Sequence, residues 1–321
     1  MPLECYVPKD FRTSSRIIIR QANSVIDEYR RAGFQLTLRQ LYYQFVSRDW
    51  LANTIQNYKR LGEIVNDARL AGLIDWDAII DRTRNLEQLP SWGRPEDILD
   101  AVASQYREPV WDAQPEYCEV WIEKDALIGV IERVCNELRV PYFACRGYTS
   151  QSEMWAAGKR LRGKLDEGKT ITIFHLGDHD PSGMQMSEDN RGRLTMFQGE
   201  EFGYDEDNEI ADLVDLEFSL KRIALNRDQI KQYNPPPNPA KESDSRYRQY
   251  VRNTGMTDSF ELDALDPRVI ASLIRSEVTS IRDEDKWAAS MEAEAKNRDL
   301  LRAAEQRWED VKAYLAREEE E

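Results

Sequence analysis

Apolar side chains in the first quarter of the chain recur at helical spacing. They predict a helix over residues 11–32, and Thr37 then opens a second helix with Gln40 in the capping-box position. A third helix is expected over residues 55–71. The next stretch, 73–83 (LIDWDAIIDRT), is typical of short strands. Three helices followed by such a wing predict a winged-helix domain of the CAP-like type, a fold frequent in DNA-binding proteins.

Strands alternate with helices in the second part of the chain. The segments 118–123 (CEVWIE), 140–146 (VPYFACR) and 170–178 (TITIFHLGD) are expected to be strands, with helices over 125–138 and 151–165 between them. This alternation predicts an α/β domain in which helices cover a parallel sheet, as in Rossmann-like folds. Ligand sites of such sheets lie beyond the carboxyl ends of the strands.

The remaining segments complete the predicted organisation. Residues 261–281 are expected to be helical, and 286–317 to form one long charged helix that leads to an acidic tail. The resulting divisions are a winged-helix domain at 1–84, a connector rich in Pro, Trp and polar residues at 85–116, a sheet domain at 117–282 and a C-terminal helical extension at 283–321.

Charge is distributed unevenly along the chain. The net charge of −15 argues against a simple DNA-binding protein, because phosphate contacts need Lys and Arg. Nine acids and no base lie in residues 200–217, whereas residues 9–69 carry eleven bases against six acids. The N-terminal part is therefore the part expected to face a phosphate backbone.

The sequence shows no secretory signal and no apolar stretch of membrane-spanning length, so we expect a cytoplasmic protein. The four cysteines are widely spaced and form no CxxC pair. This spacing favours reduced, mostly buried thiols over a zinc site or a disulfide framework.

Carboxylates follow two of the expected strands. Glu123 ends the first strand, and Asp178 and Asp180 follow the third. Oxygen ligands at this edge of a sheet suit Mg²⁺, for which Mn²⁺ could substitute, and Glu123 could alternatively act as an acid or base. Taken alone, DHDPSG is equally typical of a solvated turn, because Asp, Pro, Ser and Gly are common turn residues.

Two motifs make the interpretation more specific. WIEKDAL (121–127) and GDHDPSG (177–183) resemble the two Toprim motifs of the topoisomerase VI A subunit and its meiotic double-strand-break relatives. The resemblance implies a Toprim domain in which Glu123, Asp178 and Asp180 hold the metal, with Lys124 beside them. The chain length is closest to that of the compact, stand-alone mini-A homologues of this superfamily.

The same family carries its nucleophile in an R-x-x-[YF]-Y motif of a preceding winged-helix domain. Here the motif is matched by RQLYY, which runs from Arg39 to Tyr43. The resemblance implies that Tyr43 is the nucleophile and that Arg39 assists it. Helical geometry places Tyr42 on the apolar face and Tyr43 on the polar flank, so Tyr43 is expected to be accessible. The alternative is a half-buried helix tyrosine with a hydrogen-bonded hydroxyl.

Further candidates for DNA contact are basic residues and one histidine. On the third helix these are Lys59, Arg60 and Arg69, although isolated cations are more often a solvated helix face. Lys124 and His179 lie within the Toprim motifs and are expected near a phosphate. His175 falls in the middle of a strand and is expected in the core.

The resemblance implies a magnesium-dependent tyrosine transesterase that cleaves double-stranded DNA and leaves a phosphotyrosyl link. It further implies a homodimer, in which paired cuts give a double-strand break. The chain has no glycine-rich ATP motif, so ATP-driven strand passage would need a companion ATPase subunit. Two alternatives stay open, a hydrolytic Toprim nuclease and a winged-helix DNA-binding protein without chemistry.

Overall fold

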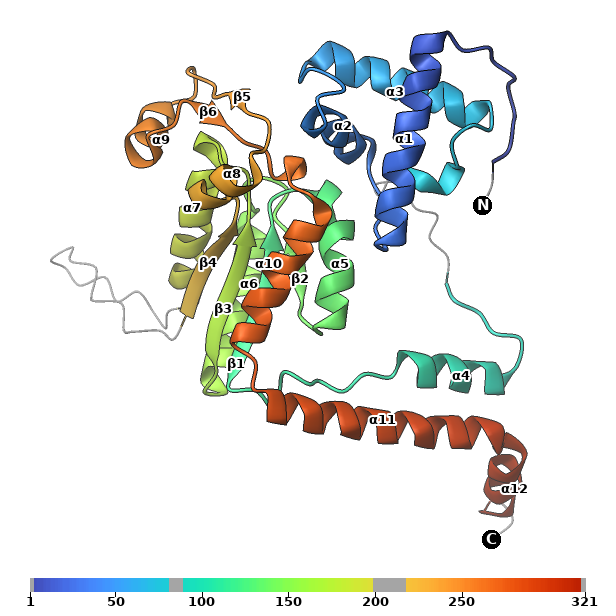
Figure 1. The fold of residues 1–321 in the computed structure, drawn as a ribbon. Helices are drawn as coiled ribbons and strands as arrows, with labels where there is room; N and C mark the ends of the chain where they lie inside the picture. Colours follow the sequence, from blue (N-terminus) through green and yellow to red (C-terminus); the bar gives the residue numbers. More distant parts are fainter. Residues whose placement is uncertain (1–2, 81–88, 199–217, 319–321) are drawn as a thin grey trace, which may run out of the picture. The chain divides into compact units, whose positions relative to one another are not determined.

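The computed structural model describes residues 3–80, 89–198 and 218–318. The chain forms two compact units, and Figure 1 shows the elements of each. Unit 1 comprises Met1–Arg84 and Cys118–Ser280, and unit 2 comprises Asn85–Tyr117 and Ile281–Glu321. The acidic run at 200–217 lies outside the described residues, as does the end of the acidic tail.

Three helices form a bundle at the start of unit 1: α1 (Thr13–Arg31), α2 (Leu38–Ser47) and α3 (Ile55–Leu70). This confirms the three predicted helices and the capping box, because the Thr37 hydroxyl accepts from the Gln40 amide and the Gln40 side chain accepts from the Thr37 amide. The apolar faces of the helices meet in one core. That core includes Ile18, Val25, Tyr29, Leu41, Phe45, Leu61 and Val65.

The wing expected over residues 73–83 is wrong for the described part of that stretch. Trp76–Ala78 forms a single 3-10 turn, and Ile79 makes only an isolated bridge to Leu36. The turn forms because the Asp75 carboxylate accepts the Asp77 amide at 3.0 Å and pairs with Arg30 at 2.7 Å. An aspartate that caps its own chain in this way favours a turn over a strand.

The sheet of unit 1 has four strands: β1 (Glu116–Ile122), β2 (Tyr142–Ala144), β3 (Thr170–Leu176) and β4 (Phe218–Ala224). The strand order is β2-β1-β3-β4 and the sheet is parallel. The first three strands confirm the prediction, and β4 was not predicted. Nearly every side chain of β1 and β3 is buried, which is typical of a parallel sheet covered on both faces.

Two pairs of helices cover this sheet. In one pair, α5 (Ile128–Glu137) packs on α10 (Pro267–Ser280), and these helices also contact β2 and β4, respectively. In the other, α6 (Gln151–Asp166) packs on α7 (Pro181–Gln198), against β3 and β4. The α/β class predicted from the alternation of elements is therefore present.

Short elements connect β4 to α10. They are, in order, α8 (Arg227–Tyr233), β5 (Asn238–Pro239), α9 (Tyr247–Thr254), β6 (Asp258–Ser259) and a 3-10 turn, η3 (Leu262–Ala264). Strands β5 and β6 pair antiparallel. Directly after β6, Phe260 forms an antiparallel bridge with His179. This bridge brings η3 to the carboxyl ends of the sheet strands.

Unit 2 contains α4 (Pro95–Gln105), α11 (Glu284–Gln306) and α12 (Trp308–Glu318). The segment predicted as a connector thus contains a helix, and α4 packs along α11. The single long helix predicted over 286–317 is interrupted at Arg307. No helix in the described part of the chain is long and apolar enough to cross a bilayer.

The fold makes a direct prediction about the helical bundle. Leu61 on α3 is fully buried, so Leu61→Ala should lower the free energy of unfolding by about 2–5 kcal/mol through lost burial and the cavity left behind. Ile55 begins the same helix but is 77% exposed. Ile55→Ala should therefore change the free energy of unfolding by no more than about 0.5 kcal/mol. Urea denaturation of both variants tests this, and equal losses would contradict the described packing.

Candidate active site

The three predicted carboxylates lie at the carboxyl ends of neighbouring strands. Glu123 directly follows β1, and its amide donates to the Leu176 carbonyl of β3 at 2.8 Å. The Asp178 amide in turn donates to Glu123 Oε2 at 2.8 Å. Asp180 Oδ1 accepts the Gly183 amide at 2.6 Å, at the start of α7. The structure thus brings Glu123 and Asp178 into contact and uses Asp180 to cap a helix.

A partly buried arginine holds the loop between β3 and α7 in place. The Arg222 guanidinium of β4 donates to the carbonyl oxygens of Gly177 at 2.8 Å, Asp178 at 2.5 Å and Gly183 at 3.0 Å. Burial lowers the pKa of Arg222 to about 10, while the nearby carboxylates oppose this shift. Sequence reasoning missed this residue, because an arginine in a strand carries no signal of such a role.

The close approach of backbone segments in this loop explains the glycine of the motif. A Cβ atom on Gly183 would lie 2.3 Å from the Asp178 carbonyl oxygen, a distance that real structures do not tolerate. A larger residue would therefore displace Asp178 or the start of α7. The motif GDHDPSG is accordingly more constrained than an ordinary solvated turn.

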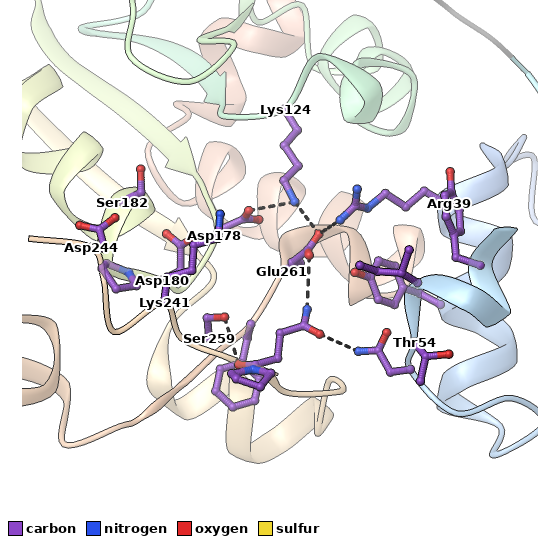
Figure 2. A pocket seen from close by; sticks show the side chains of 18 of the residues that line it. Arg39, Thr54, Lys124, Asp178, Asp180, Ser182, Lys241, Asp244, Ser259 and Glu261 are labelled. Carbon is purple, nitrogen blue, oxygen red and sulfur yellow. Dashed lines mark hydrogen bonds and ion pairs between the residues drawn. The ribbon is translucent and has the colours of Figure 1, made fainter. Parts of the chain in front are cut away.

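An ion cluster joins the strand ends to the helical bundle. Lys124 Nζ lies 2.8 Å from Asp178 Oδ2, 3.1 Å from Glu261 Oε2 and 3.2 Å from Asp263 Oδ2. Arg39 of α2 pairs with the same Glu261 oxygen and reaches Asp263 Oδ2 with its Nε at 3.2 Å. Figure 2 shows Lys124 and Arg39 reaching Glu261 from different elements. Sequence reasoning missed Glu261 and Asp263, which lie far along the chain from both motifs.

Tyr43 is less accessible than the helical wheel predicted. It is 4% exposed and belongs to the core of the helical bundle, and its helix α2 also packs against η3, a contact that helical periodicity does not reveal. Arg39 lies 5.8 Å from the centroid of the Tyr43 ring, so the predicted pair is close together. Burial, together with the charge of Glu261, raises the pKa of Tyr43 to about 12, while Arg39 and Lys124 oppose the shift.

Tyr42 is a core residue, as predicted. Its ring is 4% exposed, and its hydroxyl accepts the Thr54 amide at 2.7 Å and lies 3.0 Å from the Thr54 carbonyl oxygen. These bonds fix the segment that precedes α3. The two adjacent tyrosines therefore differ in their surroundings. The Tyr42 hydroxyl is hydrogen-bonded to backbone groups, whereas Tyr43 lies beside charged side chains.

A pocket of about 780 Å³ opens between the helical bundle and the strand ends, both within unit 1. It is lined from one side by residues of α2 and the start of α3, and from the other by the strand-end loop and the segment around β5 and β6. The lining includes Arg39, Tyr43, Tyr58, Lys124, Asp178, Asp180, Lys241 and Glu261. The predicted nucleophile and two of the three predicted metal ligands thus share one pocket in a single chain.

The predicted DNA contacts on α3 are not among the residues that line this pocket. Lys59 and Arg60 are exposed on α3. Arg69 donates to the Trp76 carbonyl at 2.6 Å and lies over the Trp76 ring, so its guanidinium has a structural role. It is therefore a weaker candidate for phosphate contact than Lys59 and Arg60.

The two histidines are both buried. His175 is buried and hydrogen-bonds Ser187 at 2.9 Å, which confirms its predicted place in the core. His179 is only 2% exposed, and its Nδ1 lies 2.9 Å from the Tyr250 hydroxyl. The His179 ring is therefore not exposed to solvent, and its predicted phosphate contact stays a prediction.

Two carboxylates at the strand ends, Glu123 and Asp178, have raised pKa values. Burial and the charges of Asp178 and Asp180 raise the pKa of Glu123 from 4.5 to about 7. Burial also raises the pKa of Asp178, although Lys124 opposes the shift. Burial alone would lower the pKa of Lys124, but Asp178, Asp263 and Glu261 raise it, so Lys124 stays charged. The cluster therefore favours any additional positive charge.

The donor atoms suit a hard cation, but they are engaged with protein groups. Among the described residues, no set of three or more acidic, histidine or cysteine side chains is arranged as a metal site. Asp178 accepts the Leu262 amide with Oδ1 at 2.8 Å and pairs with Lys124 through Oδ2. A divalent cation would fit the oxygen chemistry of Glu123, Asp178 and Asp180, and it would have to displace Lys124 from Asp178.

The comparisons with known proteins add no family assignment. No model of a protein family, no curated protein and no solved structure matches this chain significantly. The site is therefore interpreted from its own geometry and from the sequence motifs.

The raised pKa of Glu123 predicts a pH-dependent stability. Unfolded Glu123 loses its proton near pH 4.5 and the folded residue near pH 7, so its destabilising effect is absent below pH 4.5 and grows up to pH 7. Glu123→Gln should therefore be more stable than the wild type above pH 7, by on the order of 2 kcal/mol, but not at pH 4. Urea denaturation in a chelator tests this, and parallel pH curves for the two proteins would contradict it.

Proposed function

We propose that this chain is a divalent-cation-dependent tyrosine transesterase that cleaves double-stranded DNA. The observation that supports this proposal best is that Arg39 and Tyr43 line the same pocket as Asp178 and Asp180. The bundle supplies the nucleophile and the sheet supplies the carboxylates. The resemblance of both sequence motifs to the topoisomerase VI A subunit and its relatives points to the same reaction.

The proposed reaction exchanges one phosphate ester for another. The Tyr43 oxygen attacks the phosphorus, an O–P bond forms to tyrosine, and the bond from phosphorus to a deoxyribose oxygen breaks. The phenol proton leaves to water in the pocket. A pKa of about 12 makes Tyr43 a weak nucleophile at neutral pH, so its phenolate needs stabilisation. Arg39, which lies over the ring, and Lys124 are the cations that lower this pKa.

Glu123 is the proposed proton donor to the leaving deoxyribose oxygen. With a pKa of about 7 it is substantially protonated at neutral pH, as a general acid must be. Asp178 and Asp180 would hold Mg²⁺ or Mn²⁺ while Glu123 acts as the acid, and the alternative is that Glu123 is a further, charged ligand of the cation. The cation would supply charge neutralisation at the phosphate. The protein's contribution is to fix these oxygens at the strand ends through Arg222 and the start of α7.

Assembly is a separate proposal. The resemblance implies a homodimer in which tyrosine and metal ligands come from different chains, whereas here both line a pocket within one chain. A homodimer would still be needed for two coordinated cuts and a double-strand break. A companion ATPase would be needed only if the breaks are coupled to strand passage.

Covalent trapping distinguishes the proposal from its alternatives. Plasmid DNA incubated with the protein and Mg²⁺ or Mn²⁺, then denatured with detergent, should yield cut DNA that enters a gel only after protease treatment. Tyr43→Phe should abolish the adduct, and Asp178→Asn should reduce it by roughly 100-fold or more, as expected for loss of a group that stabilises the transition state. Tyr58→Phe is the matched control, because Tyr58 lines the same pocket without a proposed chemical role.

Other outcomes would favour the two alternatives. Cleavage without attached protein that persists in Tyr43→Phe would establish a hydrolytic Toprim nuclease instead. DNA binding with no cleavage by any variant, and an Asp178→Asn variant altered only in thermal stability, would favour a binding protein without chemistry.

A further inference from the structure

The Glu261 carboxylate occupies a position suited to a phosphate. Arg39 and Lys124 both contact its Oε2, the latter at 3.1 Å, and the Asn238 amide nitrogen lies 3.3 Å from its Oε1. A guanidinium, an ammonium and an amide that converge on one anion are typical of phosphate recognition. All three donors line the pocket that also contains Tyr43 and Asp178.

Glu261 is held by side chains that can also hold another anion. Every hydrogen bond and ion pair described for the Glu261 carboxylate is made with another side chain. The Glu261 side chain itself is 23% exposed in the pocket. Burial alone would raise the pKa of Glu261, but Lys124 and Arg39 lower it below its usual value, so the residue stays charged. A charged, partly exposed carboxylate of this kind can be exchanged for a second anion without a change in the core.

Asp263 is more buried than Glu261 and contacts the same two cations, so it can hold them in place when Glu261 moves away. Its side chain is 3% exposed, and it lies 3.2 Å from both Arg39 Nε and Lys124 Nζ. If Glu261 turns away, Asp263 still holds both cations in place. A phosphodiester carries one negative charge, so its exchange for Glu261 would leave the charge of the cluster unchanged.

We propose that Arg39, Lys124 and Asn238 form a binding site for a phosphate of the nucleic-acid backbone, and that Glu261 closes this site as an internal substitute for the phosphate. The assignment of DNA as the ligand rests on the proposed function. Binding then requires DNA to displace Glu261. The resting protein should therefore bind DNA weakly until enough of the backbone is engaged to offset this displacement.

Affinity for a fluorescent DNA duplex, measured by anisotropy in a chelator, tests the proposal without cleavage. Glu261→Gln should bind about tenfold more tightly than the wild type, since one charge-assisted bond to phosphate is worth roughly that factor. Inorganic phosphate should also compete more effectively for this variant. The matched control is Glu277→Gln, which removes a carboxylate that pairs with Lys221 at 2.6 Å outside the pocket and should change affinity by less than about twofold.

A second variant separates a specific site from a general effect of charge. Adding Lys124→Met to Glu261→Gln should abolish the gain, because the phosphate then lacks its ammonium partner. A gain that survives this addition, or no gain in folded Glu261→Gln, would overturn the proposal. If Glu261→Gln does not fold, Glu261→Asp decides the question, because the shorter side chain withdraws the carboxylate and should still tighten binding; unchanged affinity would refute the proposal.

The result is independent of the proposed chemistry. A gain in affinity that Lys124→Met abolishes, in a protein that never forms a covalent adduct, would support the phosphate site and reject the transesterase. A covalent adduct without any gain in DNA affinity for Glu261→Gln would support the transesterase and reject the phosphate site.

Discussion

The site depends on how the segment Phe260–Asp263 is bonded to the carboxyl ends of the sheet. Phe260 pairs through its backbone with His179, and the Leu262 amide donates to Asp178. The intervening Glu261 and the following Asp263 then meet Arg39 of α2 and Lys124 after β1. Without these ion pairs, α2 would lose its charged contacts with the sheet edge. The position of Tyr43 beside the carboxylates follows from this one segment.

The acidic groups of the site are only partly neutralised by cations, in a chain whose net charge is −15. Asp178, Glu261 and Asp263 share two cations, Arg39 and Lys124, and burial together with the charge of Asp178 raises the pKa of Glu123. Acidic groups this close together are costly unless they are paired or coordinate a cation. The third carboxylate therefore supports the proposed binding of a cation at this site.

Local signals made much of the fold predictable, and tertiary contacts account for most of what was missed. The capping box at Thr37 and the alternation of strands and helices both arise from near neighbours in sequence. The carboxylates were placed correctly at the strand ends, because the ends of parallel strands meet at one edge. Glu261 was missed because its partners lie 222 and 137 residues away along the chain. For the same reason a helical wheel could not show that α2 packs against η3.

The proposed reaction requires Tyr43 to lie close to a divalent cation held by the strand-end carboxylates. A fluorotyrosine at position 43, observed by fluorine NMR during titration with Mn²⁺, tests this most directly, because paramagnetic relaxation falls steeply with distance. We expect Mn²⁺ to broaden the signal in the otherwise unaltered protein, and Asp178→Asn and Asp180→Asn to weaken the effect. A sharp signal that saturating Mn²⁺ leaves unchanged in the folded protein would contradict the account.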